Sequence, residues 1–215
     1  MNRFFKDGAT VLFQGDSVTD CGRKRDADAS YPENMGEGYA KVFKDIYDKL
    51  FPDNDINFVN KGVSGDRVRD LIARYDADFK AVNPDFVSIM IGINDTWRGY
   101  DSDDFCTPER FESEYDMLLS KIKTDFPEAK ILIIEQFALV NHPERHWNED
   151  LTPKREITRK MAEKYADYFI PMFDILNNAS DNEFPMSVLS GDGVHPAPVG
   201  HSYIAAEIFK VLGII

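Results

Sequence analysis

Three residues of the sequence carry side chains able to act together in nucleophilic catalysis. Ser17 follows an apolar run in VLFQGDSVTD (11–20), and His195 lies in SGDGVHPAP (190–198), three residues after Asp192. A serine hydroxyl is a weak nucleophile that needs an adjacent base, itself oriented by a third group. The D-x-x-H spacing allows the carboxylate to hold one imidazole nitrogen while the other faces the serine. Each motif alone is also ordinary turn or cap chemistry, so the prediction of acyl transfer depends on further partners.

Acyl transfer also requires hydrogen-bond donors aimed at a developing oxyanion. Gly65, in VNKGVSGDRVRDL (59–71), lacks a Cβ, so its N–H group can approach a substrate closely. Asn94, in IGINDTWRGY (91–100), offers a side-chain amide donor, and the Ser17 N–H is a third. A turn glycine and a helix cap would explain the first two equally well in isolation. Their joint placement after strand ends favours the functional interpretation.

The remaining histidines indicate no metal centre. His142 and His146 are four residues apart in HPERHW (142–147), but Pro143 disfavours a helix and the H-E-x-x-H pattern is absent. We interpret them as loop residues, and His201 as packed or solvated inside the last helix. The run DSDD (101–104) matches no cation-binding loop and is interpreted as solvated. We therefore expect neither a metal nor an organic cofactor.

Five short apolar runs predict buried strands, and helical patterns lie between them. The strands are predicted at 10–14, 56–60, 85–91, 130–135 and 168–172, and the helices at 38–50, 67–82, 107–126, 152–167 and 197–213. Nearly continuous apolar strands favour a parallel sheet covered on both faces. Two helices begin with Thr-Pro, a typical cap followed by proline at the first helical position. Strand–helix alternation predicts one α/β/α sandwich domain over residues 1–215.

The connections place the candidate residues at one edge of this sheet. Returns from helix to strand are short, whereas the connections 15–37, 92–107 and 136–151 are long. Ligands of open α/β sheets bind outside the carboxyl ends of the strands. We therefore expect a site at that edge.

The composition limits which partners and which cellular compartment are expected. The 215 residues carry a net charge of −13, which disfavours binding to nucleic acid or anionic membranes and suits a neutral small substrate. Two cysteines, Cys21 and Cys106, show no C-x-x-C spacing, which fits a reducing compartment. With no signal-peptide pattern and no apolar run of membrane-spanning length, we predict a cytoplasmic protein.

The four blocks together resemble the SGNH (GDSL-type) hydrolases. GDS at 15–17, Gly65 in G-x-S-G-D, G-x-N-D at 92–95 and D-x-x-H at 192–195 occur in family order across nearly the whole chain. The first block reads GDSV where GDSL or GDSI is commoner. The resemblance implies a flavodoxin-like five-stranded parallel sheet of order 2-1-3-4-5. It also implies that Ser17 is the nucleophile, His195 the base and Asp192 the orienting carboxylate, with an oxyanion hole of Ser17, Gly65 and Asn94.

A narrower likeness covers the first 135 residues. GDSVTDCGR, VNKGVSGDRVRDL and VSIMIGINDTWR are similar to stretches of bacterial intracellular acetylxylan esterases. This similarity implies short-chain, acetyl-ester hydrolysis, with an acyl ester or acetylated sugar as the partner. Substrate binding is assigned to Asp16, Trp97, Arg98 and Tyr100, with Trp97 and the aromatic Trp147 able to stack on a sugar ring. Arg23 and Arg98 have three open interpretations: binding sugar hydroxyls, pairing with acids, or solvation.

Two other functions remain alternatives. One is a lysophospholipase or thioesterase of the same family, and the other is a non-catalytic flavodoxin-like ligand-binding module. The natural alcohol, the acyl-length limit and a homo-oligomeric state are left open by the sequence.

Overall fold

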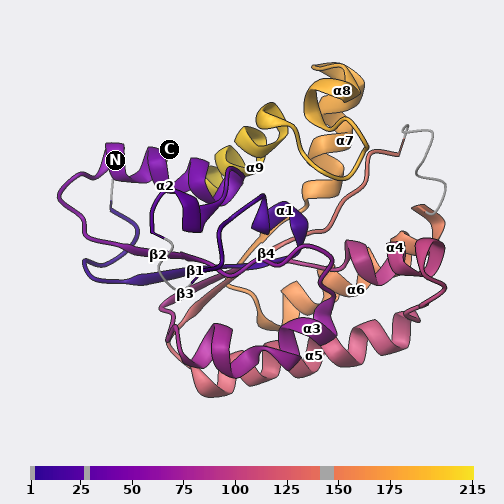
Figure 1. Cartoon of the computed structure of the whole chain (residues 1–215), viewed down its shortest axis with the longest axis horizontal. Coiled ribbons are helices and arrows are strands. Elements are labelled where there is room, and N and C mark those ends of the chain that lie inside the picture. Colours follow the sequence, from indigo (N-terminus) through magenta and orange to yellow (C-terminus); the bar gives the residue numbers. More distant parts are fainter. Residues whose placement is uncertain (1–2, 27–29, 141–147) are drawn as a thin grey trace.

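The computed structural model describes residues 3–26, 30–140 and 148–215, and its centre is a five-stranded parallel sheet (Figure 1). The strand order is β2-β1-β3-β4-β5, which confirms the predicted 2-1-3-4-5 arrangement. Val11 of β1 is paired with Phe58 of β2 on one side and Phe86 of β3 on the other. The strands are β1 (Thr10–Gly15), β2 (Asn57–Asn60), β3 (Phe86–Met90), β4 (Lys130–Ile134) and β5 (Tyr168–Ile170).

Helices cover both faces of the sheet and form the outer layers of the sandwich (Figure 1). One layer contains α2 (Tyr39–Leu50), α7 (Met172–Asn182), α8 (Met186–Leu189) and α9 (Pro198–Val211). The other contains α3 (Val68–Ala73), the π-helical turn η2 (Asp76–Lys80), α5 (Pro108–Asp125) and α6 (Asn148–Tyr165). Short elements at the sheet edge are α1 (Ser17–Asp20), the 3₁₀ turn η1 (Glu33–Met35) and α4 (Ile93–Asp101).

The core divides into two halves because successive side chains of a strand point to opposite faces. In β4, Leu132 and Ile134 pack with the layer of α2 and α9, whereas Ile131 and Ile133 pack with the layer of α5 and α6. All four side chains are fully buried. Burial on both faces explains why this strand is almost continuously apolar in the sequence.

Two predicted helices differ from the structure. The helix predicted to start at Thr152 begins at Asn148, so Pro153 lies inside it and Thr152 donates its hydroxyl hydrogen to the Asn148 carbonyl. A proline near a helix start removes one hydrogen bond, and burial of Leu151 in the upstream turn favours the longer helix. The helix predicted at 67–82 is divided into α3 and η2, although the segment contains no glycine or proline that would indicate a break.

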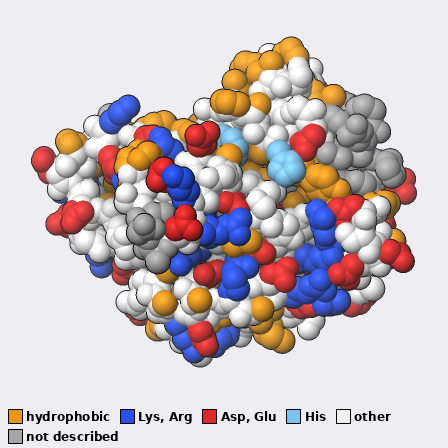
Figure 2. Space-filling model, viewed as in Figure 1, with side chains coloured by type: hydrophobic (Ala, Val, Ile, Leu, Met, Phe, Trp, Pro, Cys, Tyr) orange, Lys and Arg blue, Asp and Glu red, His pale blue; other side chains and the backbone are white. Residues whose placement is uncertain are grey.

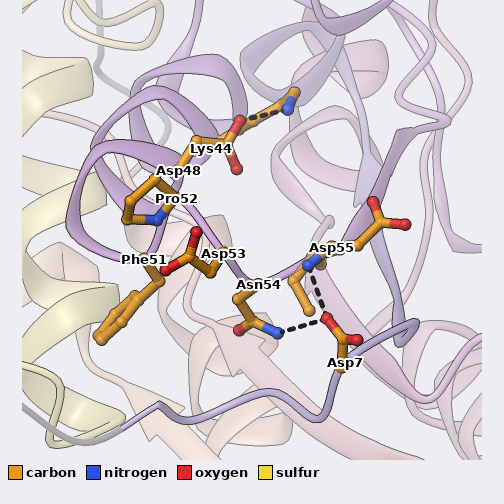
Figure 3. Close-up of a pocket in the computed structure, with 9 residues that line it drawn as sticks. Asp7, Lys44, Asp48, Phe51, Pro52, Asp53, Asn54 and Asp55 are labelled. Atoms are coloured by element: carbon orange, nitrogen blue, oxygen red, sulfur yellow. Dashed lines mark hydrogen bonds and ion pairs between the residues drawn. The ribbon is translucent and has the colours of Figure 1, made fainter.

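The edge where the strands begin holds a hollow of about 470 Å³ between the end of α2 and the start of β2 (Figure 3). In it, Asp7 accepts hydrogen bonds from the Asp55 N–H at 2.8 Å and the Asn54 side chain at 3.4 Å. These hydrogen bonds hold the pKa of Asp7 below its ordinary value. This hollow lies at the opposite edge from the strand ends, and its contacts fasten the N-terminal segment to the sheet.

Candidate active site

Ser17 begins α1 immediately after the central strand β1. A Cβ at Gly15 would collide with the Met90 carbonyl oxygen and the Thr19 hydroxyl, so the strand must end on glycine. Asp16 then caps the helix, its Oδ1 accepting a hydrogen bond from the Val18 N–H at 3.0 Å. Close packing on one side and a cap on the other therefore fix the position of Ser17.

The side chains of Ser17, His195 and Asp192 form a continuous hydrogen-bonded line. Ser17 Oγ lies 2.9 Å from His195 Nε2, although the two residues are 178 positions apart in the chain. His195 Nδ1 lies 2.6 Å from Asp192 Oδ2. This arrangement has the geometry that activates a serine hydroxyl, with an imidazole between the hydroxyl and a carboxylate.

Asp192 shapes the loop that carries the histidine as well as contacting its ring. Its Oδ1 accepts hydrogen bonds from the N–H groups of Val194 at 2.9 Å and His195 at 2.8 Å. Burial by itself would raise the pKa of Asp192, but the hydrogen bonds from the His195 ring and these two N–H groups outweigh it and hold the pKa below its ordinary value. The carboxylate therefore stays ionised when a proton reaches the imidazole.

Ser190 supports the same loop and was not singled out in the sequence. Its hydroxyl lies within hydrogen-bond distance of the His195 carbonyl, at 2.7 Å, and of Asp192 Oδ1, at 3.2 Å. An isolated bridge between Ser190 and Pro196 closes the turn. The only sequence signal for this role is position, because a hydroxyl residue two places before the aspartate is compatible with many turns.

The proposed oxyanion donors come from separate loops that meet at the strand ends. Gly65 has a φ of +88°, a conformation that favours glycine even though a Cβ there would meet nothing within 4 Å. Asn94 is 2% exposed, and its Nδ2 donates to the Asp66 carbonyl at 3.0 Å. The amide nitrogen has a second hydrogen, and this contact fixes its direction. The N–H of Ser17 belongs to the first turn of α1, where backbone donors have no partner within the helix.

Asp20 holds the Gly65 loop in place. Its Oδ2 accepts hydrogen bonds from both the N–H and the hydroxyl of Ser64, at 2.9 and 3.0 Å, and pairs with Arg25 at 2.6 Å. Asp20 is 2% exposed. Thus a carboxylate at the end of α1 connects the serine-bearing segment to the glycine donor, a role that no local motif in the sequence indicates.

The four residues assigned to substrate binding have different surroundings. The Trp97 ring lies 5.7 Å from the His195 ring, which places an aromatic ring beside the hydrogen-bonded line of Ser17, His195 and Asp192. Arg98 pairs with Asp101 at 2.6 Å and contacts Asn94 Oδ1 at 3.3 Å, so it is paired with an acid. Tyr100 is 43% exposed and donates to Asp150. Asp16 is 1% exposed, which favours a structural role over substrate contact.

The other candidates have the following positions. His201 is packed, as predicted, and its Nδ1 accepts the Tyr39 N–H at 3.1 Å. Arg23 is half-buried and donates to the Gly62 carbonyl at 2.7 Å. The run 101–104 is not simply solvated, because Asp104 pairs with two arginines that approach it from α3, Arg67 and Arg69. His142, His146 and Trp147 lie outside the described residues.

The face that carries the histidines combines charges of both signs (Figure 2). Histidine side chains lie in a hollow there, with hydrophobic side chains above and a belt of basic and acidic side chains below. Several basic side chains of the protein are neutralised locally: Arg74 pairs with both Asp66 and Asp78, and Arg25 pairs with Asp20. A neutral substrate fits such a balanced surface better than a polyanion.

Replacing Asp16 with asparagine should change how stability depends on pH. Burial raises the pKa of Asp16 to about 7, so the folded state favours the protonated carboxyl. Its stabilising contribution is complete below the unfolded pKa and is lost as the pH rises through 7. The side-chain oxygen of an asparagine at position 16 can still accept the hydrogen bond from the Val18 N–H, but the amide does not titrate. As the pH rises from 5 to 8, we expect the unfolding free energy of wild type to fall by about 3 kcal/mol relative to that of Asp16→Asn, measured by urea unfolding.

The matched control for this experiment is Asp53→Asn at the exposed turn before β2. It should shift the unfolding free energy by the same amount at both pH values. A difference between wild type and Asp16→Asn that does not change with pH would contradict the burial argument.

The comparisons with known proteins agree with this geometry. A model of the GDSL-like lipase/acylhydrolase family matches residues 13–203. The chain belongs to this family. An acetylxylan esterase from Geobacillus stearothermophilus is 32% identical over 96% of this chain and 94% of its own. The protein is therefore a carboxylic ester hydrolase, and the family resemblance of its four sequence blocks is confirmed.

Solved structures extend the similarity to the whole sheet. A GDSL-like lipase from Parabacteroides merdae superposes with a TM-score of 0.92 at 30% identity, covering 98% of each chain. Structures of catalytic mutants of the Geobacillus acetylxylan esterase superpose with a TM-score of 0.87 at 30% identity, covering 98% of this chain and 97% of theirs. In these mutants a histidine or a serine is replaced by alanine. Among the described residues, no helix has the length and apolar character required to cross a membrane.

Proposed function

We propose that the protein is a serine esterase that removes acetyl groups from xylo-oligosaccharides or related sugars through an acyl-enzyme on Ser17. The observation that carries this proposal is the hydrogen-bonded line of Asp192, His195 and Ser17, with spacings of 2.6 and 2.9 Å. In the first step, Ser17 Oγ bonds to the ester carbonyl carbon while its proton passes to His195 Nε2. Asp192 stabilises the imidazolium that results.

The tetrahedral intermediate then collapses. The negative charge on the former carbonyl oxygen is held by the N–H groups of Ser17 and Gly65 and by the Asn94 amide. His195 returns its proton to the departing sugar oxygen, which breaks the original ester bond and leaves an acetyl group on Ser17. A water molecule, deprotonated by His195, attacks this acetyl group and releases acetate with the serine restored.

The preference for a short acyl group has two supports. Residues next to Ser17 and His195 in the sequence, Val18 and Val194, line a cavity of only about 10 Å³, so the structure offers no large apolar space there for a long acyl chain. Moreover, the relative with 32% identity is an acetylxylan esterase. Trp97, beside the His195 ring, supports a sugar as the alcohol, because an aromatic face stacks on the apolar face of a pyranose.

A substrate panel tests this assignment. Acetylated xylose, its butyryl analogue, a lysophospholipid and an acyl-CoA are each incubated with the protein, and products are measured by mass spectrometry. We expect the acetyl sugar to have the highest kcat/KM and the butyryl analogue to lose at least roughly tenfold. Faster turnover of the lysophospholipid or acyl-CoA would instead favour the alternative, which a relative from Escherichia coli, a thioesterase 1/protease 1/lysophospholipase L1 at 24% identity, keeps open. A cytoplasmic location stays a prediction.

A further inference from the structure

A cluster of three potential metal ligands lies on the far side of α4 from the catalytic line. Asp95, Cys106 and Glu114 each offer one ligand atom, and these atoms all lie within 4.8 Å of one another. Asp95 comes from α4, Cys106 from the loop before α5, and Glu114 from α5 itself. A thiol with two carboxylates is a donor set that zinc and related divalent ions accept.

Several oxygen atoms at this place have no hydrogen-bond partner among the described residues. They are Asp95 Oδ1, Thr96 Oγ1 and Glu114 Oε2, all of them buried. Asp95 is 1% exposed and Thr96 is 3% exposed. Buried polar atoms are normally satisfied, and three unsatisfied oxygens around one thiol indicate a missing partner of positive or donor character.

A cavity of about 200 Å³ provides access to the cluster. Asp95, Thr96 and Cys106 line it together with Lys154 and the loop before α5. The space suffices for an ion with a bound water. Neither Ser17 nor His195 lines it, and of the three potential ligands Asp95 and Cys106 do but Glu114 does not. The site is thus separate from the one that carries the proposed hydrolysis.

Charged groups surround the cluster. Lys154 is 4% exposed and lines the same cavity. Arg110 pairs with Glu114 Oε1 at 2.7 Å, which leaves the other carboxylate oxygen for a ligand bond. A thiol binds a metal ion as its thiolate, so binding at Cys106 releases a proton.

We propose that Asp95, Cys106 and Glu114 form a binding site for a single divalent ion of the zinc class. In a tetrahedral site with these bond lengths, ligand atoms lie roughly 3.3–3.8 Å apart, so the cluster contracts by about 1 Å on binding. Thr96 Oγ or water completes the coordination. The ion joins α4 to α5 behind Asn94, next in sequence to Asp95, and so it stabilises the segment that carries the oxyanion donor without entering the reaction.

Cobalt titration tests the site, since cobalt(II) bound by a thiolate gives a charge-transfer absorption in the near ultraviolet. Chelator-treated protein is titrated with Co²⁺ at pH 8, and we expect this band to saturate at one equivalent and to disappear when Zn²⁺ is added. Cys106→Ser should lose the band. Cys21→Ser, which removes the other thiol of the chain, is the matched control and should retain it.

Two further measurements guard against a variant that merely misfolds. Glu114→Gln keeps the thiol but removes a ligand charge, and it should weaken Co²⁺ binding by more than roughly tenfold. Zn²⁺ should raise the Tm of wild type but not of Cys106→Ser, each compared with its own metal-free Tm. Absence of the band in wild type, its survival in Cys106→Ser, or its loss in Cys21→Ser would each overturn the proposal. Ester hydrolysis is measured in parallel, so failure of the metal site remains distinguishable from failure of the proposed function.

Discussion

Replacing either Ser17 or His195 with alanine should lower kcat for acetate release by roughly 10⁴-fold or more. Ser17→Ala removes the atom that would bond to the acyl group, and His195→Ala removes the base 2.9 Å from that atom. The two changes act on one step, so the double variant should be hardly slower than either single variant. Single-turnover measurements on acetylated xylose separate a slower chemical step from weaker substrate binding. We expect the chemical step to slow and KM to change little.

The control for the serine is Ser202→Ala. Ser202 lies on α9 and bonds only to the Pro198 carbonyl among the described contacts, so its removal should leave kcat unchanged. A fluorophosphonate should label wild type and Ser202→Ala but not Ser17→Ala. Labelling of Ser17→Ala, or a kcat within tenfold of wild type, would refute the nucleophile assignment.

Replacing Asn94 with alanine should lower kcat by about 10²–10³-fold, with a smaller effect on KM. In the proposed oxyanion hole the amide would donate most strongly as negative charge develops on the oxygen, so its loss should raise the energy of the transition state more than that of the bound substrate. Because Asn94 also bonds to the Asp66 carbonyl at 3.0 Å, the thermal unfolding of the variant is measured beside its kinetics. The expected decrease in kcat must be observed at temperatures where Asn94→Ala is fully folded.

The matched control is Asn182→Ala at the exposed end of α7, where the side chain bonds only within its own helix among the described contacts. This variant should retain wild-type kcat. If Asn94→Ala were as active as Asn182→Ala, the amide would have no part in the oxyanion hole, and that function would rest with the N–H groups of Ser17 and Gly65.

The sequence predicts the sheet well because its three central strands, β1, β3 and β4, are buried on both faces. The runs around Leu12, Ile89 and Ile133 are almost continuously apolar, as expected of parallel strands covered by helices. Asp192 and His195 were predictable for another reason: they lie three residues apart, so their contact is a local property of one loop.

Features that join distant segments were not predictable in the same way. Nothing in the spacing of Asp95, Cys106 and Glu114 suggests that three separate segments bring them together. Likewise, in the sequence Asp104 is part of an acidic run. Its two partners, Arg67 and Arg69, come from the start of α3, which only the fold brings close to it. The local preference of Pro153 predicts a helix start at that residue, whereas burial of Leu151 favours the start of α6 one turn earlier, at Asn148.

Ser17 and its hydrogen-bond partner His195 are 178 positions apart in the chain. This separation has a consequence for biosynthesis. A ribosome releases the serine segment early, but His195 emerges only when all five strands have already been made. Until residue 195 has been made, the Ser17 hydroxyl therefore has no imidazole beside it. Any hydrolysis that depends on this contact requires the loop that carries His195 to have folded against the end of β1.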